Sequence, residues 1–256
     1  MNTQHPECCP PGSHGRAASH YLNAKGQLER WTLAGNEVDV YIVGPADAHT
    51  TVLAIGDIFS IHEGRIKGCS DFLAERGHRV VVPDFHKGDS MVMGDGFMAR
   101  IGQFFANHPI DEVVEMVRDA SNKVRGEGKK LVTMGFCWGT WVQYRAMKGK
   151  VAMDGAICLH PSIVAEDMQG GNHSTLIAEQ NCPVMIAAAG NDLPWTKPGG
   201  EMEENAAKLG YGEKSKFYEF ADMAHGWTVR GDIKDEKIAR DVDIVFNNAL
   251  DFIKSL

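Results

Sequence analysis

The 256-residue sequence has no long apolar run, no basic leader and no excess of positive charge. Its start, Met1 to His5, lacks the basic and apolar segments of a secretory leader, and no later run approaches the roughly 18 apolar residues of a membrane-spanning helix. With 26 basic and 34 acidic residues, the formal charge of -8 argues against a broad surface for nucleic acid or anionic lipid. We therefore expect a cytoplasmic protein that binds neither nucleic acid nor a membrane.

Cysteine is also scarce, and its distribution indicates thiols and not disulfides. The six cysteines are even in number, but four are scattered through segments that we expect to be buried: Cys69, Cys137, Cys158 and Cys182. Small disulfide-stapled domains carry cysteine at a much higher density. The pattern fits reduced thiols in a reducing compartment.

Strands and helices alternate along most of the chain. Such alternation is typical of an α/β fold with a mostly parallel sheet and helices on both faces. Proline, glycine, serine and histidine are frequent at the start, so we expect residues 1–25 to form an extended N-terminal arm and residues 26–256 a single domain. We expect a monomer or a weak homodimer. The expected strands are 38–43, 51–55, 79–82, 131–134, 155–159, 184–189 and 216–220, and the expected helices are 64–76, 111–125, 138–147, 201–208 and 235–253.

The stretch Gly135-Phe136-Cys137-Trp138-Gly139 follows a predicted buried strand and precedes a predicted helix. It has the pattern of a nucleophile elbow, with cysteine in place of the usual serine and with glycines that leave room for a strained turn. The helix would direct the positive end of its dipole at the thiol. Taken alone, the pattern also fits an inert core thiol, because cysteine is often buried. Suitable partners at later strand ends would favour a reactive thiol.

Two such partners follow later strands, at the carboxyl ends where the working groups of a parallel sheet gather. Asp192 follows the strand ending at 189, and His225 follows the last strand. A cysteine nucleophile needs a histidine that takes its proton and an acid that orients the imidazole. The order Cys137, Asp192, His225 therefore predicts a catalytic triad, with Asp222 as the competing acid. His160 also ends a strand, and it is either a pocket-lining residue or a hydrogen-bonded turn residue.

An oxyanion hole would need two backbone donors near the thiol. The N–H of Trp138 follows the nucleophile directly, and the N–H of Ile58 lies in the loop after an early strand, so these two are the candidates. Asp57 comes just before Ile58 and is expected near Cys137. Its carboxylate either accepts a hydrogen bond from the thiol or structures its own loop.

Together these motifs resemble the dienelactone hydrolase family of α/β-hydrolases. The resemblance covers nearly everything from about residue 30 to the C-terminus, and it is carried by the stretches 56–59, 77–85, 135–139, 190–192 and 224–227. It implies the α/β-hydrolase fold, a Cys-His-Asp triad, hydrolysis of lactones or esters through an acyl-cysteine, and no cofactor. The arm segment 6–12 is similar to the N-terminus of a largely eukaryotic branch of the family.

The chain also departs from the family pattern at the expected substrate-binding positions. Bacterial members typed on dienelactone carry Glu where Asp57 stands, and they hold the substrate carboxylate with two arginines. Lys87 stands near one of these positions, and Arg230 is displaced by about a residue from the other. Lysine presents a point charge and not a planar fork, so the resemblance implies less precise carboxylate recognition and argues against dienelactone itself as the substrate.

Two residue clusters invite a further interpretation. His5, Cys8, Cys9 and His14 in the arm suggest zinc, but adjacent cysteines fit no common ligand spacing, so we expect no metal. The methionine-rich stretch 91–98 is expected to be adaptable packing or an apolar wall of the pocket.

The sequence therefore predicts a cysteine-dependent hydrolase of small-molecule lactones or activated carboxylic esters. Two alternatives place other functions on the same fold: a non-hydrolytic small-molecule receptor with a vestigial triad, and a thiol redox sensor that uses Cys137. The complete triad argues against the receptor. The lack of a second cysteine close to Cys137 in the sequence argues against the sensor.

Overall fold

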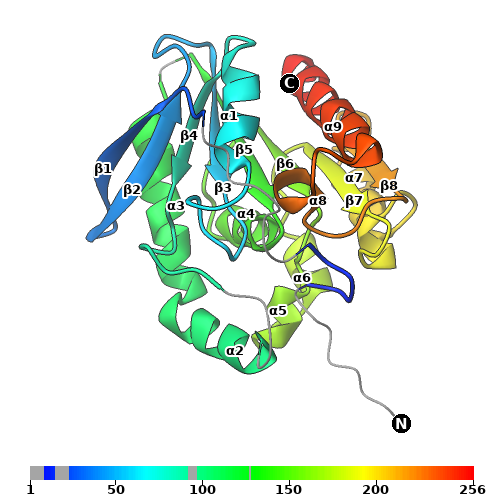
Figure 1. Cartoon of the computed structure of the whole chain (residues 1–256). Coiled ribbons are helices and arrows are strands. Elements are labelled where there is room, and N and C mark those ends of the chain that lie inside the picture. Colours follow the sequence, from blue (N-terminus) through cyan, green and yellow to red (C-terminus); the bar gives the residue numbers. More distant parts are fainter. Residues whose placement is uncertain (1–8, 15–22, 92–96, 127) are drawn as a thin grey trace.

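The computed structural model describes residues 9–14, 23–91, 97–126 and 128–256, and it is built around one eight-stranded sheet (Figure 1). The strands lie in the order β1-β2-β4-β3-β5-β6-β7-β8. From β4 to β8 all neighbours are parallel, whereas β2 is antiparallel to both β1 and β4. The expected mostly parallel sheet is confirmed. The strands are β1 (Gln27–Leu33), β2 (Asn36–Val43), β3 (Thr50–Ile55), β4 (Arg79–Pro83), β5 (Lys130–Phe136), β6 (Gly155–Leu159), β7 (Val184–Ala189) and β8 (Lys216–Phe220).

Helices connect the strands and flank the sheet (Figure 1). None in the described part of the chain is both long enough and apolar enough to cross a bilayer. The helices are α1 (Ile66–Ala74), α2 (Phe97–Asn107), α3 (Ile110–Val124), α4 (Trp138–Lys148), α5 (Ala165–Met168), α6 (His173–Ile177), the 3₁₀ turn η1 (Pro194–Thr196), α7 (Glu201–Lys208), α8 (Trp227–Arg230) and α9 (Glu236–Ser255).

Helices cover both faces of the sheet because neighbouring residues of a strand point to opposite sides. Leu53 and Leu131 belong to one buried cluster, together with apolar residues of α3 and α4. Val52 and Val132, their neighbours in sequence, belong to a second cluster with apolar residues of α1 and α9. Strands β3 and β5 are therefore buried on both faces, which explains why they read as continuous apolar runs. The expected coverage on both faces is confirmed.

Strand β1 and helix α2 were not predicted from the sequence. β1 is an edge strand whose residues Gln27 to Arg30 are exposed, so it lacks the apolar alternation that marks a half-buried strand. It exists because it pairs along its whole length with β2. α2 lies in the long excursion between β4 and α3, and it begins directly after residues 92–96, which are outside the described part.

The parallel core of the sheet brings distant residues to one edge. The carboxyl ends of β3, β5, β6, β7 and β8 point the same way. The segments that follow these ends carry Asp57, Cys137, His160, Asp192 and His225 respectively. This edge is where the residues singled out in the sequence meet.

Candidate active site

Cys137 lies on a strained turn between β5 and α4. Its φ of 53° and ψ of -114° fall in a region that residues other than glycine rarely occupy. Both flanking glycines are needed: a Cβ on Gly139 would lie 2.2 Å from the backbone oxygen of Ile55, and one on Gly135 would lie 2.3 Å from Oε1 of Gln143. This is the backbone geometry of a nucleophile elbow.

Hydrogen bonds hold the backbone of Cys137 in this conformation. Its N–H donates to the carbonyl of Leu159 at 3.0 Å. Its carbonyl accepts from the hydroxyl of Thr140 at 2.6 Å and from the N–H of Ser162 at 3.2 Å. These bonds to α4 and to the segment after β6 offset the strain and fix the direction of the thiol.

His225 and Asp192 reach Cys137 from the ends of β8 and β7. Nδ1 of His225 lies 2.6 Å from Oδ1 of Asp192, and an imidazole nitrogen lies within 4.8 Å of Sγ of Cys137. Because Nδ1 faces the carboxylate, Nε2 is the nitrogen that remains for the thiol. The competing acid Asp222 is mostly exposed, and its carboxylate lies 3.6 Å from Nζ of Lys237. The structure thus places the expected acid, base and nucleophile in one chain of contacts.

The surroundings of His225 favour its protonated form. Burial by itself lowers the pKa of His225, but the charges of the Cys137 thiolate and of Asp192, with hydrogen bonds to both, raise it to about 10. An imidazolium beside the thiol stabilises the thiolate, which is the nucleophilic form of cysteine. Cys137 and His225 are each only 2% exposed, so their interaction is shielded from water.

Ser162 and His160 complete the surroundings of His225. Oγ of Ser162 lies 3.2 Å from Sγ of Cys137 and 3.3 Å from Nε2 of His225, a placement that sequence reasoning missed. Its position directly after the β6 end was the available signal. The buried His160 ring meets the His225 ring edge to face at 5.0 Å, and its Nε2 lies 2.5 Å from Oγ1 of Thr228. Burial, and then the charge of His225, lower the pKa of His160 well below its usual value.

The two residues expected at the oxyanion hole are both buried. Trp138 is the first residue of α4, so its N–H belongs to the first turn, where N–H groups lack partners inside the helix. Ile58 follows β3, whose end is in van der Waals reach of Gly139. The carbonyl of Ile58 accepts from the N–H of Met91 at 2.9 Å, which ties its loop in place.

The two cationic side chains that were expected to bind a substrate carboxylate form ion pairs with carboxylates of this chain. Arg230 donates from Nε and Nη2 to the two carboxylate oxygens of Asp57, each at 2.6 Å, and its Nη1 lies 3.6 Å from Glu63. Nζ of Lys87 lies 2.9 Å from Oε1 of Glu112. Asp57 also accepts from the N–H of Phe59 in its own loop. Of its two expected roles, the contacts of Asp57 therefore favour the structuring one.

The described part of the N-terminal arm covers the site. The N–H of His14 donates to the carbonyl of His225 at 2.8 Å. Asn191 donates from Nδ2 to the carbonyl of Pro11 at 3.0 Å, and its Oδ1 accepts from the N–H of His225 at 2.7 Å. Cys9 is buried, and its Sγ lies within 4.8 Å of that of Cys137. Of the other arm residues for which zinc was considered and not expected, His5 and Cys8 lie outside the described residues, as do residues 92–96 of the methionine-rich stretch.

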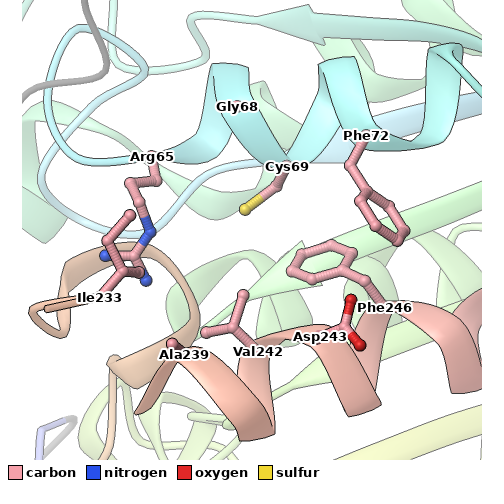
Figure 2. A pocket seen from close by; sticks show the side chains of 9 residues that line it. All are labelled: Arg65, Gly68, Cys69, Phe72, Ile233, Ala239, Val242, Asp243 and Phe246. Carbon is pink, nitrogen blue, oxygen red and sulfur yellow. The ribbon is translucent and has the colours of Figure 1, made fainter. Parts of the chain in front are cut away.

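A separate, mostly apolar cavity of about 320 Å³ lies between α1 and α9 (Figure 2). The thiol of Cys69 points into it from α1. Burial raises the pKa of Cys69 to about 12, so this thiol stays protonated. The cavity is lined by Arg65, Gly68, Cys69, Phe72, Ile233, Ala239, Val242, Asp243 and Phe246.

Known proteins share this sequence pattern and fold. A model of the dienelactone hydrolase family matches residues 38–256. An uncharacterized AIM2 family protein of Schizosaccharomyces pombe is 28% identical over 97% of this chain and 98% of its own length. The hydrolase tropI of Talaromyces stipitatus is 26% identical over 77% of this chain and 78% of its own. The crystal structure of dienelactone hydrolase from Anabaena variabilis has a TM-score of 0.58 at 11% identity, covering 86% of this chain and 96% of that chain. The chain therefore belongs to the dienelactone hydrolase family and has the α/β-hydrolase fold.

Proposed function

We propose that this hydrolase cleaves small-molecule lactones or activated carboxylic esters through an acyl-cysteine on Cys137. One observation carries the proposal: a strained elbow presents the buried thiol of Cys137 to the imidazole of His225. The pKa of this imidazole is raised, which favours its protonated form, and a carboxylate anchors the ring. A structural cysteine needs neither the strain nor the charged partner.

In the first step the Cys137 thiolate attacks the carbonyl carbon, and the carbonyl oxygen becomes an oxyanion. The backbone N–H groups of Ile58 and Trp138 are the proposed donors to that oxyanion. The tetrahedral intermediate then collapses to a thioester. The imidazolium of His225 gives its Nε2 proton to the departing alkoxide, and Asp192 holds the ring in place throughout.

In the second step water hydrolyses the thioester. Neutral His225 now takes a proton from water through Nε2, and the resulting hydroxide attacks the acyl carbon. The acid leaves and the thiolate and imidazolium are restored. Because a cysteine acylates readily but its thioester must still be hydrolysed, enol lactones, activated esters and thioesters fit these steps better than amides.

Substrate must reach a site that the arm covers in this structure. Cys137, His225 and Asp192 are all buried, and residues 9–14 contact the loops that carry the acid and the base. We therefore propose that the arm moves when substrate binds. Because acidic side chains already hold Lys87 and Arg230, we propose that these two residues modulate the site through their ion pairs and do not bind a substrate carboxylate directly.

We also propose a cytoplasmic location and a monomer or weak homodimer. Cys69, Cys158 and Cys182 are buried and not joined in disulfides, which suits a reducing compartment. Among the described residues the large exposed hydrophobic side chains are few and scattered, which supports a chain that is stable without a large interface: Leu28, Leu209, Ile233 and Ile244.

A panel of aryl esters and lactones, assayed with the wild type, Cys137→Ala and the control Cys69→Ser, tests the hydrolytic proposal. We expect turnover in the wild type and in Cys69→Ser and none in Cys137→Ala. Intact mass measurement of His225→Ala should show an acyl adduct on Cys137, because deacylation is blocked. Turnover by Cys137→Ala would exclude the cysteine mechanism. Binding without turnover would favour the receptor, and reversible peroxide modification without hydrolysis would favour the redox sensor.

A further inference from the structure

Cys9 brings a second thiol to the nucleophile. The Sγ atoms of Cys9 and Cys137 and an imidazole nitrogen of His225 all lie within 4.8 Å of one another, and all three residues are buried. Cys9 belongs to the N-terminal arm, whereas Cys137 and His225 follow β5 and β8. Two sulfur donors and one nitrogen donor from three distant parts of the sequence therefore lie close together.

Specific contacts hold the arm segment that carries Cys9. His14 donates its N–H to the carbonyl of His225, and the carbonyl of Pro11 accepts from the side chain of Asn191. A Cβ on Gly226 would lie 3.0 Å from the carbonyl oxygen of His14, so the arm packs closely on the start of α8. Figure 1 shows this blue segment next to α8. The position of Cys9 thus follows from contacts with the same loops that position the base.

We propose that Cys9, Cys137 and His225 bind a thiophilic divalent cation such as Zn²⁺. Two thiolates and one imidazole are a ligand set that zinc uses with water or another ligand in the fourth position. Zn–S bonds of about 2.3 Å and Zn–N bonds of about 2.0 Å place tetrahedral ligand atoms roughly 3.5 Å apart. The three donor atoms lie within 4.8 Å of one another, so they need to close by at most about 1.3 Å, a movement that side-chain rotation can supply.

The surroundings of the three donors suit a metal site. A zinc-bound histidine usually donates its other ring N–H to a carboxylate, which fixes the ring and makes it a better ligand. Asp192 already lies 2.6 Å from Nδ1 of His225, which leaves Nε2 for the metal. Ser162 borders the fourth position, with Oγ 3.2 Å from Sγ of Cys137 and 3.3 Å from Nε2 of His225. The site therefore has a rigid base, unlike a site made from the arm alone.

Binding of the cation releases protons from its ligands. The imidazolium of His225 gives up its Nε2 proton, and the thiol of Cys9 gives up its proton, while Cys137 binds as the thiolate. Two protons pass to solvent for each cation bound, so affinity should rise with pH. No electron transfer is involved.

The bound cation would block hydrolysis, because it occupies the nucleophile and the base and pins the arm over them. This inhibitory consequence rests on the hydrolytic function proposed above. The metal site itself rests on the positions of Cys9, Cys137 and His225 and not on hydrolysis, so the two proposals are separable by experiment.

Zinc affinity of the full-length protein, kept reduced with a non-chelating phosphine, tests the site by competition with a chromophoric chelator. We expect one equivalent to bind the wild type. Removing a group that only hydrogen-bonds to a zinc ligand already lowers zinc affinity by about 10–100-fold. Cys9→Ser and Cys137→Ala each remove a ligand itself, so each should weaken zinc binding by at least about 100-fold. Cys69→Ser removes a buried thiol from the cavity of Figure 2 and should bind as the wild type does.

Cobalt gives a second readout that does not depend on activity. Co²⁺ in the wild type should show sulfur-to-metal charge-transfer absorption, and Cys9→Ser should lose about half of it because one of two thiolates is gone. Wild-type affinity or an unchanged spectrum in Cys9→Ser would overturn the proposal. Retained binding in Cys137→Ala would also overturn it, since the ligands would then lie in the arm alone.

Hydrolysis assays on the same samples separate the two proposals. Zinc bound through Cys9 and Cys137, with turnover that survives in Cys137→Ala, supports the metal site and excludes the cysteine mechanism. Turnover that requires Cys137, with zinc affinity unchanged in Cys9→Ser, supports the cysteine mechanism and excludes the metal site. If both proposals hold, zinc should inhibit the wild type and Cys69→Ser alike, and chelation should restore turnover.

Discussion

Arg230 and Asp57 form a two-pronged ion pair in the interior, with Nε–Oδ2 and Nη2–Oδ1 distances of 2.6 Å. Their side chains are 1% and 4% exposed. The guanidinium also stacks over the Phe59 ring, 4.1 Å from its centre. The pair joins the loop after β3, which carries the proposed oxyanion donor Ile58, to helix α8, which begins two residues after His225. It therefore links two parts of the site that are far apart in sequence.

Arg230→Met should destabilise the protein strongly, because it leaves the Asp57 carboxylate buried without its partner. Breaking such a pair costs about 3–5 kcal/mol. Urea unfolding measures the change. The matched control is Lys87→Met, whose partly exposed pair with Glu112 should contribute less than about 1 kcal/mol. An unchanged urea midpoint for Arg230→Met, with a sharply raised KM, would instead show that Arg230 serves the substrate.

Gly139→Ala should disrupt the elbow, because the added Cβ would lie 2.2 Å from the carbonyl oxygen of Ile55, which belongs to backbone that is buried in the sheet. Overpacking of this kind costs about 1–3 kcal/mol or more, and activity should fall with it. Thermal unfolding and ester turnover provide the measurements. The control is Gly102→Ala in α2, where a Cβ meets open space and alanine should stabilise the helix by about 0.5–1 kcal/mol. Equal behaviour of the two variants would contradict the close approach.

His225 should stay protonated well above its ordinary pKa of 6.5, up to about pH 10. The titratable groups that face it are Cys137, Cys9, Asp192, His160 and His14. Since its folded-state pKa is raised, its contribution to stability is fully present below pH 6.5 and is lost as the pH rises through about 10. NMR titration of the imidazole measures the pKa directly.

The same titration in Cys137→Ala tests the cause of the shift. Removal of the thiolate takes away the largest effect that raises the pKa, so burial should weigh more heavily and the midpoint of His225 should fall below that of the wild type. Cys69→Ser should leave the midpoint unchanged. A wild-type midpoint near 6.5, or no response to loss of Cys137, would rule out the thiolate–imidazolium pair.

Ser162→Ala should slow the proposed acylation, because the hydroxyl contacts both Cys137 and His225. Hydrogen bonds to charged groups contribute about 1.5–3 kcal/mol, which corresponds to roughly a 10–100-fold decrease in kcat/KM. The measurement is the rate of thiol alkylation by iodoacetamide together with ester kinetics. Ser162→Thr keeps the hydroxyl and should recover part of the loss. Wild-type kinetics in Ser162→Ala would leave Ser162 with a packing role only.

The sequence predicted the central strands, the main helices and the positions of Cys137, Asp192 and His225, because each depends on local pattern. A buried parallel strand is an apolar run, and a residue that follows it must lie at the carboxyl edge of the sheet. β1 escaped prediction because its exposed residues carry no such pattern. Ser162 escaped because its role depends on the turn after β6, whose conformation has no sequence period.

The sequence by itself determined the fold class and the chemical types available at one edge of the sheet. The alternation of strands and helices implies a parallel core, and parallel strands bring their carboxyl ends to one edge of the sheet. Only the tertiary structure decided which side chains pair. It gave Arg230 to Asp57, placed Ser162 between Cys137 and His225, and brought Cys9 to the nucleophile. These contacts join segments far apart in the chain, so they depend on how loops and the arm pack and not on local preference.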